Sequence, residues 1–144
     1  MSHVFAQKRE TNQIISILTG CGGILKEKTG TFSTPSYPDL YPGDQTCKWI
    51  ISAPPGNIIQ LMWMNFQLER SHECMYDYVE VFDNNTETGE GSSIGKFCGQ
   101  TIPATLLSTS NLVTVNFHSD PTQHLSGFLA TYNIILEANG KYSD

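Results

Sequence analysis

Apolar and polar residues alternate along most of the chain, and this period of two predicts β-strands. In Leu112–Ser119, the side chains of Val113, Val115 and Phe117 would share one face of a strand, with polar residues on the other. Seven further segments alternate in the same way, or form short apolar runs bounded by turn residues: Thr29–Thr34, Lys48–Ser52, Ile58–Leu68, Tyr78–Asp83, Ile94–Cys98, Thr105–Ser108 and Phe128–Leu136. Many short strands of this kind predict an all-β fold in which two sheets pack as a sandwich.

The polar segments between these strands carry turn residues. Pro35–Asp44 contains prolines that lack an amide donor, so it can be neither a helix nor a central strand. Pro54–Asn57 predicts a tight turn for the same reason, and Asn84–Ser93 is acidic and glycine-bearing, as is typical of a solvated loop.

The β-like region covers residues 21–137, which is enough for one domain with its own core and too short for two. We expect residues 1–20 to be a linker or the remnant of a preceding region, and residues 138–144 to be a polar tail. Only the apolar run Ile14–Leu18 has helical character, and it is too short for a signal peptide or a bilayer span. The chain therefore looks like a module of a larger protein, without membrane insertion.

Composition narrows the class of partner. Apolar residues make up 39% of the chain and charged residues 15%, which is typical of a globular domain. The net charge is −6, so the chain offers no electrostatic attraction to nucleic acid or to anionic lipid. Basic partners and divalent cations suit this charge better.

The four cysteines, Cys21, Cys47, Cys74 and Cys98, are widely spaced and even in number. No Cys-x-x-Cys pair occurs, which argues against zinc, so we expect disulfides and an oxidising compartment. Three connectivities are available, and we favour the sequential one, Cys21–Cys47 with Cys74–Cys98. Each bridge would stabilise the fold by about 3–4 kcal/mol in the chain-entropy model. Asn84 begins an Asn-x-Thr glycosylation acceptor, which agrees with secretion.

Three carboxylates are the candidate chemistry. Glu69 and Asp77 lie on either side of Cys74, and Asp120 follows the strand pattern of Leu112–Ser119. Acids gathered at one end of a sandwich repel one another and would need a cation, and Ca²⁺ takes oxygen ligands of this kind. The alternative is a solvated acidic edge in which Asp77 is only a turn acceptor.

Enzymatic interpretations are weak. His72 lacks the second histidine of a metalloprotease helix, and we expect His72, His118 and His124 to be surface residues. No Gly-x-Ser-x-Gly motif occurs, and the cysteines are assigned to disulfides. Trp63 faces the core if Ile59 and Leu61 do, and is exposed if Met62, Met64 and Phe66 fill the core instead; the core is favoured.

Several motifs together resemble the CUB domain family over residues 21–136. They are Cys21–Gly23, Gly30–Phe32, Ser36–Pro42, Cys47–Ile51, Phe66–Glu69, Cys74–Val81, Gly95–Gly99 and Gly127–Tyr132. The resemblance implies a jelly-roll-like sandwich of two antiparallel sheets, the sequential disulfides, and a non-catalytic role in a secreted protein or the extracellular part of a larger one.

The resemblance also implies a Ca²⁺ site with Glu69, Asp77 and Asp120 as carboxylate ligands. Backbone carbonyls of Thr122 and Gln123 would complete the shell, although Pro121 restricts this segment. Tyr41 would brace the acids and help meet a ligand.

The expected function is a Ca²⁺-dependent interaction module. A lysine or arginine of an extracellular partner would dock against Glu69 and Asp120 beside Tyr41. Two alternatives remain: a structural or self-associating domain, including a homodimer, in which Ca²⁺ only stabilises one end, and a glycan-binding domain. Acidic charge argues against sulfated glycans.

Overall fold

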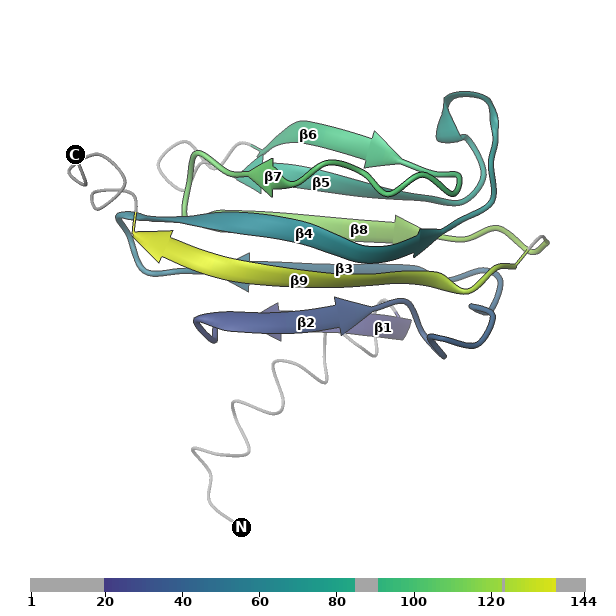
Figure 1. Ribbon diagram of the computed structural model, residues 1–144, viewed down its shortest axis with the longest axis horizontal. Coiled ribbons are helices and arrows are strands. Elements are labelled where there is room, and N and C mark those ends of the chain that lie inside the picture. The colour runs from purple at the N-terminus through teal and green to yellow at the C-terminus, as the bar shows by residue number, and fades with distance from the viewer. Residues whose placement is uncertain (1–19, 85–90, 123, 137–144) are drawn as a thin grey trace, which may run out of the picture.

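The computed structural model describes residues 20–84, 91–122 and 124–136, and these form two β-sheets packed face to face (Figure 1). The strands are β1 Gly20–Leu25, β2 Thr29–Ser33, β3 Thr46–Ser52, β4 Asn57–Gln67, β5 Tyr78–Asn84, β6 Gly91–Phe97, β7 Leu106–Leu107, β8 Leu112–His118 and β9 Gly127–Leu136. One turn of 3₁₀-helix, His72–Cys74, lies between β4 and β5. The all-β prediction is confirmed. The expected linker at residues 1–20, apart from Gly20, and the tail at 138–144 lie outside the described residues.

The strand order is β1-β3-β8-β5-β6 in one sheet and β2-β9-β4-β7 in the other. All neighbours are antiparallel except β1 and β3, which run parallel. The prediction of two antiparallel sheets therefore holds for every pair but this one. A parallel pair at a sheet edge arises because residues 26–45 return to β3 by way of the opposite sheet.

The sequence pattern did not predict β1, because it is rich in glycine. Gly22 adopts φ +104°, and a Cβ there would lie 2.0 Å from the Lys48 carbonyl oxygen on β3. Only glycine allows so close an approach. The eight predicted strands are present, with altered ends: the Thr105–Ser108 prediction shrinks to β7, and β6 begins before Ile94.

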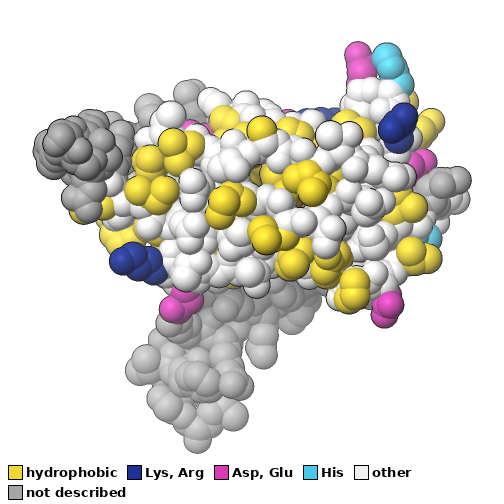
Figure 2. Space-filling view, in the orientation of Figure 1, with side chains coloured by type: hydrophobic (Ala, Val, Ile, Leu, Met, Phe, Trp, Pro, Cys, Tyr) yellow, Lys and Arg dark blue, Asp and Glu magenta, His cyan; other side chains and the backbone are white. Residues whose placement is uncertain are grey.

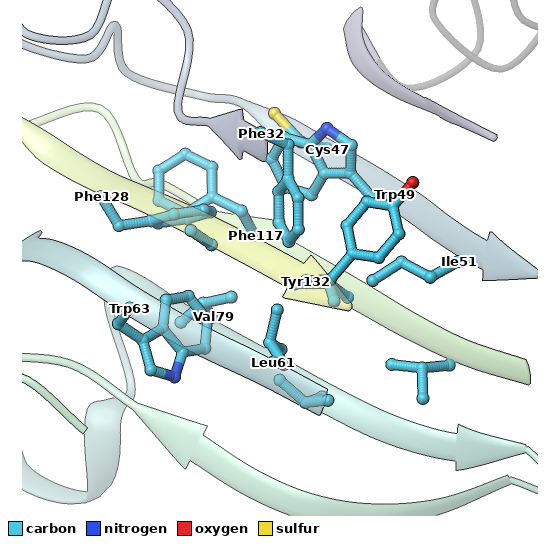
Figure 3. Close-up of a cluster of buried hydrophobic side chains, with 14 of the residues drawn as sticks. Phe32, Cys47, Trp49, Ile51, Leu61, Trp63, Val79, Phe117, Phe128 and Tyr132 are labelled. Carbon is cyan, nitrogen blue, oxygen red and sulfur yellow. The ribbon is translucent and has the colours of Figure 1, made fainter. Parts of the chain in front are cut away.

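Aromatic side chains fill the space between the sheets (Figure 3). Phe128 on β9 lies at the centre, with Trp49, Trp63 and Phe117 within 6 Å of its ring centroid. These rings meet edge to face, the arrangement that aromatic quadrupoles favour. Tyr132 and Phe32 extend the same cluster toward β3.

Trp63 and Phe66 are both buried, although they are three residues apart on one strand. The register between β4 and β9 shifts between Trp63 and Asn65, so a β-bulge reverses the alternation at Met64. Trp63 therefore faces the core as favoured, and Met64 is 56% exposed. Of the alternative in which Met62, Met64 and Phe66 fill the core, only the burial of Phe66 holds.

The disulfides are Cys21–Cys47 and Cys74–Cys98, as predicted. The first joins β1 to β3, where the two residues are register partners. The second joins the 3₁₀ turn to the residue after β6. The first bridge thus joins two neighbouring strands, and the second joins two segments that flank β5 and β6.

A buried carboxylate organises the end of the sandwich at which β5 finishes. Asp83 accepts hydrogen bonds from the Thr109 amide at 2.6 Å, the Thr109 hydroxyl at 2.8 Å and the Ser110 hydroxyl at 2.5 Å. Burial alone would raise the pKa of Asp83, but these donors outweigh it and lower the pKa below its usual range. Asp83 thus anchors the turn before β8.

Candidate metal centre

The three predicted acids meet at one end of the sandwich. Glu69 lies two residues beyond β4, Asp77 directly precedes β5, and Asp120 lies two residues beyond β8. Because β5 and β8 are antiparallel, with Tyr78 opposite His118, the start of one meets the end of the other. One carboxylate oxygen of each acid lies within 4.8 Å of the others. Strands from both sheets therefore build this site, at the end where the arrows of β4 and β8 point (Figure 1).

Asp77 is the innermost of the three and is fully buried. Its Oδ2 accepts a hydrogen bond from the Tyr41 hydroxyl at 2.6 Å, and its Oδ1 accepts one from the Asp120 amide at 2.8 Å. Each oxygen keeps a further lone pair. Asp77 therefore fixes the loop of Tyr41 and the loop of Asp120 relative to each other.

Tyr41 lies beneath the acids. Its ring packs edge to face on Phe117 at 5.3 Å, and its hydroxyl also accepts a hydrogen bond from the Glu69 amide at 3.2 Å. The side chain has no exposed surface. Burial and the bond to Asp77 raise the pKa of Tyr41, so its hydroxyl remains a donor to Asp77. These hydrogen bonds suit the expected bracing of the acids, and the lack of exposed surface argues against the direct contact with a partner that the resemblance implies.

The backbone amide of Glu69 is held by its hydrogen bond to Tyr41, but no described residue donates a hydrogen bond to Oε1 of its side chain. Its Oε1 is buried and has no hydrogen-bond partner among the described residues. Desolvation and the nearby charges of Asp77 and Asp120 raise the pKa of Glu69. A buried carboxylate oxygen without a donor is costly and calls for a cation.

The electrostatics of Asp77 agree with those of Glu69. Burial is the largest influence and raises the pKa of Asp77, and repulsion from Asp120 adds to it; the hydrogen bonds from Tyr41 and from the Asp120 amide only partly offset this. Both pKa values are raised because the charged forms lack compensation. Among the described residues, only His124 offsets part of this repulsion, at Glu69, so the ionised cluster suits an added positive charge.

Pro121 leaves the backbone beyond Asp120 in a turn. The Thr122 amide donates to Asp120 Oδ1 at 3.1 Å, and the Asp120 carbonyl accepts from the Asp44 amide at 3.1 Å. Thr122 is exposed beside the acids, which suits the predicted use of its carbonyl. Gln123 lies outside the described residues.

Two residues near the site were not anticipated from the sequence. Ser119 accepts from the Gln45 amide and donates to the Pro42 carbonyl, both at 2.9 Å, and so holds the β2–β3 loop beside Asp120. His124, expected at the surface, is half-buried with its Nδ1 enclosed, and its ring lies 6.0 Å from that of Tyr41. A Cβ at Gly43 would lie 2.7 Å from His124 Cε1, so this glycine makes room for the ring. His72 is exposed, and the His118 ring lies 5.4 Å from that of Tyr78, at a tilt of 31°.

The donor set fits a hard cation. The cluster offers carboxylate oxygens from Glu69, Asp77 and Asp120, and no histidine or cysteine in the described part of the chain joins it. Ca²⁺ accepts such oxygens together with backbone carbonyls and water. The buried, unpartnered Glu69 Oε1 is the structural observation that supports this fit.

Comparisons with known proteins agree with this architecture. The chain is 45% identical to human membrane frizzled-related protein over 114 residues, covering 79% of this chain and 20% of that protein. It therefore spans about a fifth of the length of this relative. The full extracellular region of zebrafish Gpr126/Adgrg6 has a TM-score of 0.72 and 38% identity, covering 81% of this chain and 15% of that one.

A second solved structure bears on the cation. The crystal structure of the MASP-1 CUB2 domain bound to Ca²⁺ has a TM-score of 0.68 and 26% identity, covering 76% of this chain and 96% of that one. Among the described residues of the present chain, no helix is long and apolar enough to cross a membrane. The sequence model of the CUB domain matches residues 21–132. On these grounds the chain belongs to the CUB domain family, whose members are non-catalytic extracellular interaction modules.

Proposed function

We propose that the chain binds one Ca²⁺ through Glu69, Asp77 and Asp120, and that the ordered acidic end docks a basic side chain of an extracellular protein. The observation that carries the proposal is the buried Glu69 Oε1, which lacks a donor and lies in a cluster whose carboxylate oxygens are within 4.8 Å of one another. The Ca²⁺-bound MASP-1 CUB2 domain supports the choice of cation.

The three acids have different tasks in this proposal. Asp77 is buried and held by Tyr41 and by the Asp120 amide, so it forms the floor of the site. Glu69 and Asp120 are partly exposed and form the rim. The carbonyls of Thr122 and Gln123 are the proposed backbone ligands. When bound, Ca²⁺ neutralises about two of the three negative charges and offsets the repulsion between them.

The negative charge that remains after Ca²⁺ binding favours a partner with a basic side chain. About one unit of charge stays on the rim, where Glu69 and Asp120 can accept charge-assisted hydrogen bonds from an ammonium or guanidinium group. Tyr41 contributes from below, by keeping Glu69 and Asp77 in register through its hydroxyl. The overall charge of −6 also favours encounter with a basic surface.

A titration with the smallest basic ligand tests the proposal. Nα-acetyl-lysine amide is added to the ¹⁵N-labelled, Ca²⁺-loaded domain, with the norleucine analogue as the uncharged control of equal length. We expect amide shifts at Glu69 and Asp120 with lysine, none with norleucine, and none with lysine in excess EDTA. Ca²⁺ binding without any response to lysine would leave Ca²⁺ as a stabiliser only, the structural alternative.

A further inference from the structure

The sheet formed by β2, β4, β7 and β9 contains no aspartate, glutamate, lysine, arginine or histidine in any of its strands. Its outer face is shown in Figure 2 as a field of white and yellow with charged side chains confined to the rim. The domain is acidic, so a whole sheet face without charge stands out from the rest of its surface.

The outer face mixes apolar and neutral polar side chains in register. Leu129 lies between Ser33 and Asn65, Thr131 lies between Thr31 and Met62, and Asn133 lies between Thr29 and Gln60. Met64 and Leu107 are the most exposed members, at 56% and 55%. The Tyr37 hydroxyl accepts from the Asn65 side-chain amide at 2.6 Å, which fixes a tyrosine at one edge of the face.

The other sheet has a different outer face. Lys48, Asn116, Glu80 and Lys96 form one cross-strand row. Lys96 lies over the Tyr78 ring at 4.3 Å, and Glu80 accepts from the Ser93 hydroxyl at 2.7 Å. Its charges are thus spread over the centre of the face, where desolvating them would be costly.

Depletion of charge at the centre, methionine and tyrosine, and a charged rim are features of protein–protein interfaces. An uncharged face gives an oppositely charged partner nothing to recognise. It does allow two acidic copies of this chain to meet without burying like charges, whereas the outer face of the other sheet would bury Lys48, Glu80 and Lys96. We propose that the β2-β9-β4-β7 face is a self-association surface, occupied by a second copy of this chain.

The dimensions of the face set the strength of this dimer. The four strands have 11 (β4), 10 (β9), 5 (β2) and 2 (β7) residues, so at about 3.3 Å per residue and about 4.8 Å between strands the face offers about 450 Å² per copy. A pair would bury about 900 Å² in total, which is below the standard size and in the range of weak, transient interfaces. The dimer is therefore weak and reversible.

An isologous pair packs the face on itself about a two-fold axis, as two sheets pack in a sandwich. Met62 is the middle residue of β4 and lies beside the central strand β9, so it is close to its own copy at the axis. The acidic end formed by Glu69, Asp77 and Asp120 lies at the strand ends and stays free in both copies.

Sedimentation equilibrium in EDTA, from about 10 μM to 1 mM, tests this independently of the calcium proposal. The wild-type weight-average mass should rise from 16.0 kDa toward the dimer mass. Met62→Glu and Met62→Lys, each alone, should weaken association at least about tenfold, and an equimolar mixture of the two should restore it. Asn116→Glu, half-buried at the centre of the other sheet, is the matched control and should associate like wild type.

The proposal is overturned by a wild-type chain that stays monomeric over this range, or by association that Asn116→Glu weakens and Met62→Glu does not. Circular dichroism checks that each variant is folded. Should a Met62 variant fail to fold, Leu107→Glu, at a more exposed position of the same face, replaces it; wild-type association in that variant contradicts the proposal.

Discussion

Asp77 shows how a single residue can serve both stability and binding. It is fully buried, yet its two accepted hydrogen bonds come from Tyr41 and the Asp120 amide, and neither donor carries a full charge. Such a carboxylate is held in place while its charge remains uncompensated, and its pKa is accordingly raised. Rigid geometry and a missing positive charge are the two properties that a cation site needs.

Tyr41→Phe tests the bracing role. The substitution removes the donor to Asp77 and the acceptor of the Glu69 amide while keeping the packing on Phe117. We expect a loss of about 1–3 kcal/mol in the free energy of unfolding, measured by urea denaturation in EDTA. Tyr37→Phe, which removes the exposed bond to Asn65, should cost less than about 0.5 kcal/mol. Equal losses in the two variants would contradict a bracing role for the Tyr41 hydroxyl.

Glu69→Gln removes the negative charge of this side chain while keeping its size, and so tests the role of the charge. Without Ca²⁺, the variant should be at least as stable as wild type, because the raised pKa of Glu69 means that its charge opposes folding. With Ca²⁺, it should be less stable than wild type, since a ligand is lost. Thermal unfolding in EDTA and in CaCl₂ measures both, and Glu73→Gln, exposed in the same loop, should behave as wild type. A Glu69→Gln variant that gains as much from Ca²⁺ as wild type does would exclude Glu69 as a ligand.

At the scale of elements, the strand ends position the acids, and one glycine joins the start of β9 to the end of β2. Gly127 begins β9 with φ +86°, and a Cβ there would lie 1.8 Å from Thr34 Oγ1. That hydroxyl accepts from the Phe128 amide at 3.1 Å, which joins β9 to the residue after β2. The contact leaves no space for any side chain.

Gly127→Ala should therefore destabilise the domain by more than about 3 kcal/mol, since it combines steric overlap with backbone strain. Gly56→Ala is the matched control, because Gly56 has φ +90° but nothing within 4 Å of an added Cβ. It should show only the strain, about 1–2 kcal/mol. Urea denaturation of both variants measures the difference, and equal losses would contradict this account of the β2–β9 contact.

Most strands could be predicted because their alternation of apolar and polar residues is local in the sequence. The β1 strand could not, since Gly22 and Gly23 carry no such pattern and the strand depends on a close approach to Lys48. The bulge at Met64 was also hidden, because a register shift depends on the partner strand β9. It explains why Trp63 and Phe66 are both inside.

The residues of the candidate site also fall into those that the sequence predicts and those that it does not. Glu69, Asp77 and Asp120 could be named in advance because each follows a family motif, and the structure brings them together. Their roles as Ca²⁺ ligands stay a prediction, as does glycosylation of Asn84. The contributions of Ser119 and His124 could not be predicted, since they arise from packing of the β2–β3 loop against the segment after β8.

At the scale of the whole molecule, the two ends of the sandwich shift the pKa values of their carboxylates in opposite directions. Asp83 is surrounded by donors and has a lowered pKa, whereas Asp77 and Glu69 have raised pKa values. Hydrogen-bond donors stabilise the charge of Asp83, whereas the described residues around Asp77 and Glu69 leave their charges only partly compensated. The seven residues of β5 place Asn84 about 23 Å from Asp77, so a glycan there would leave the acidic end open.

The effect of Ca²⁺ on stability should consequently depend on pH. Without Ca²⁺, the contribution of Asp77 and Glu69 is favourable below their unfolded pKa values, near 4, and is lost as pH rises through their raised folded values. Ca²⁺ requires the ionised forms, so the difference in Tm between CaCl₂ and EDTA should be near zero at about pH 4 and about 5–15 °C at pH 7.5 with about 10 mM Ca²⁺. Differential scanning calorimetry measures it. A difference that does not change with pH would contradict carboxylate ligation.

The central claim is that Glu69, Asp77 and Asp120 together hold one Ca²⁺, and calorimetric titration of the decalcified domain with CaCl₂ tests it most directly. The account predicts a single site with a dissociation constant of about 10⁻⁴–10⁻³ M or tighter, and its loss in Asp120→Asn while the circular dichroism spectrum is retained. No binding by the folded wild-type domain, or unchanged binding by Asp120→Asn, would contradict it.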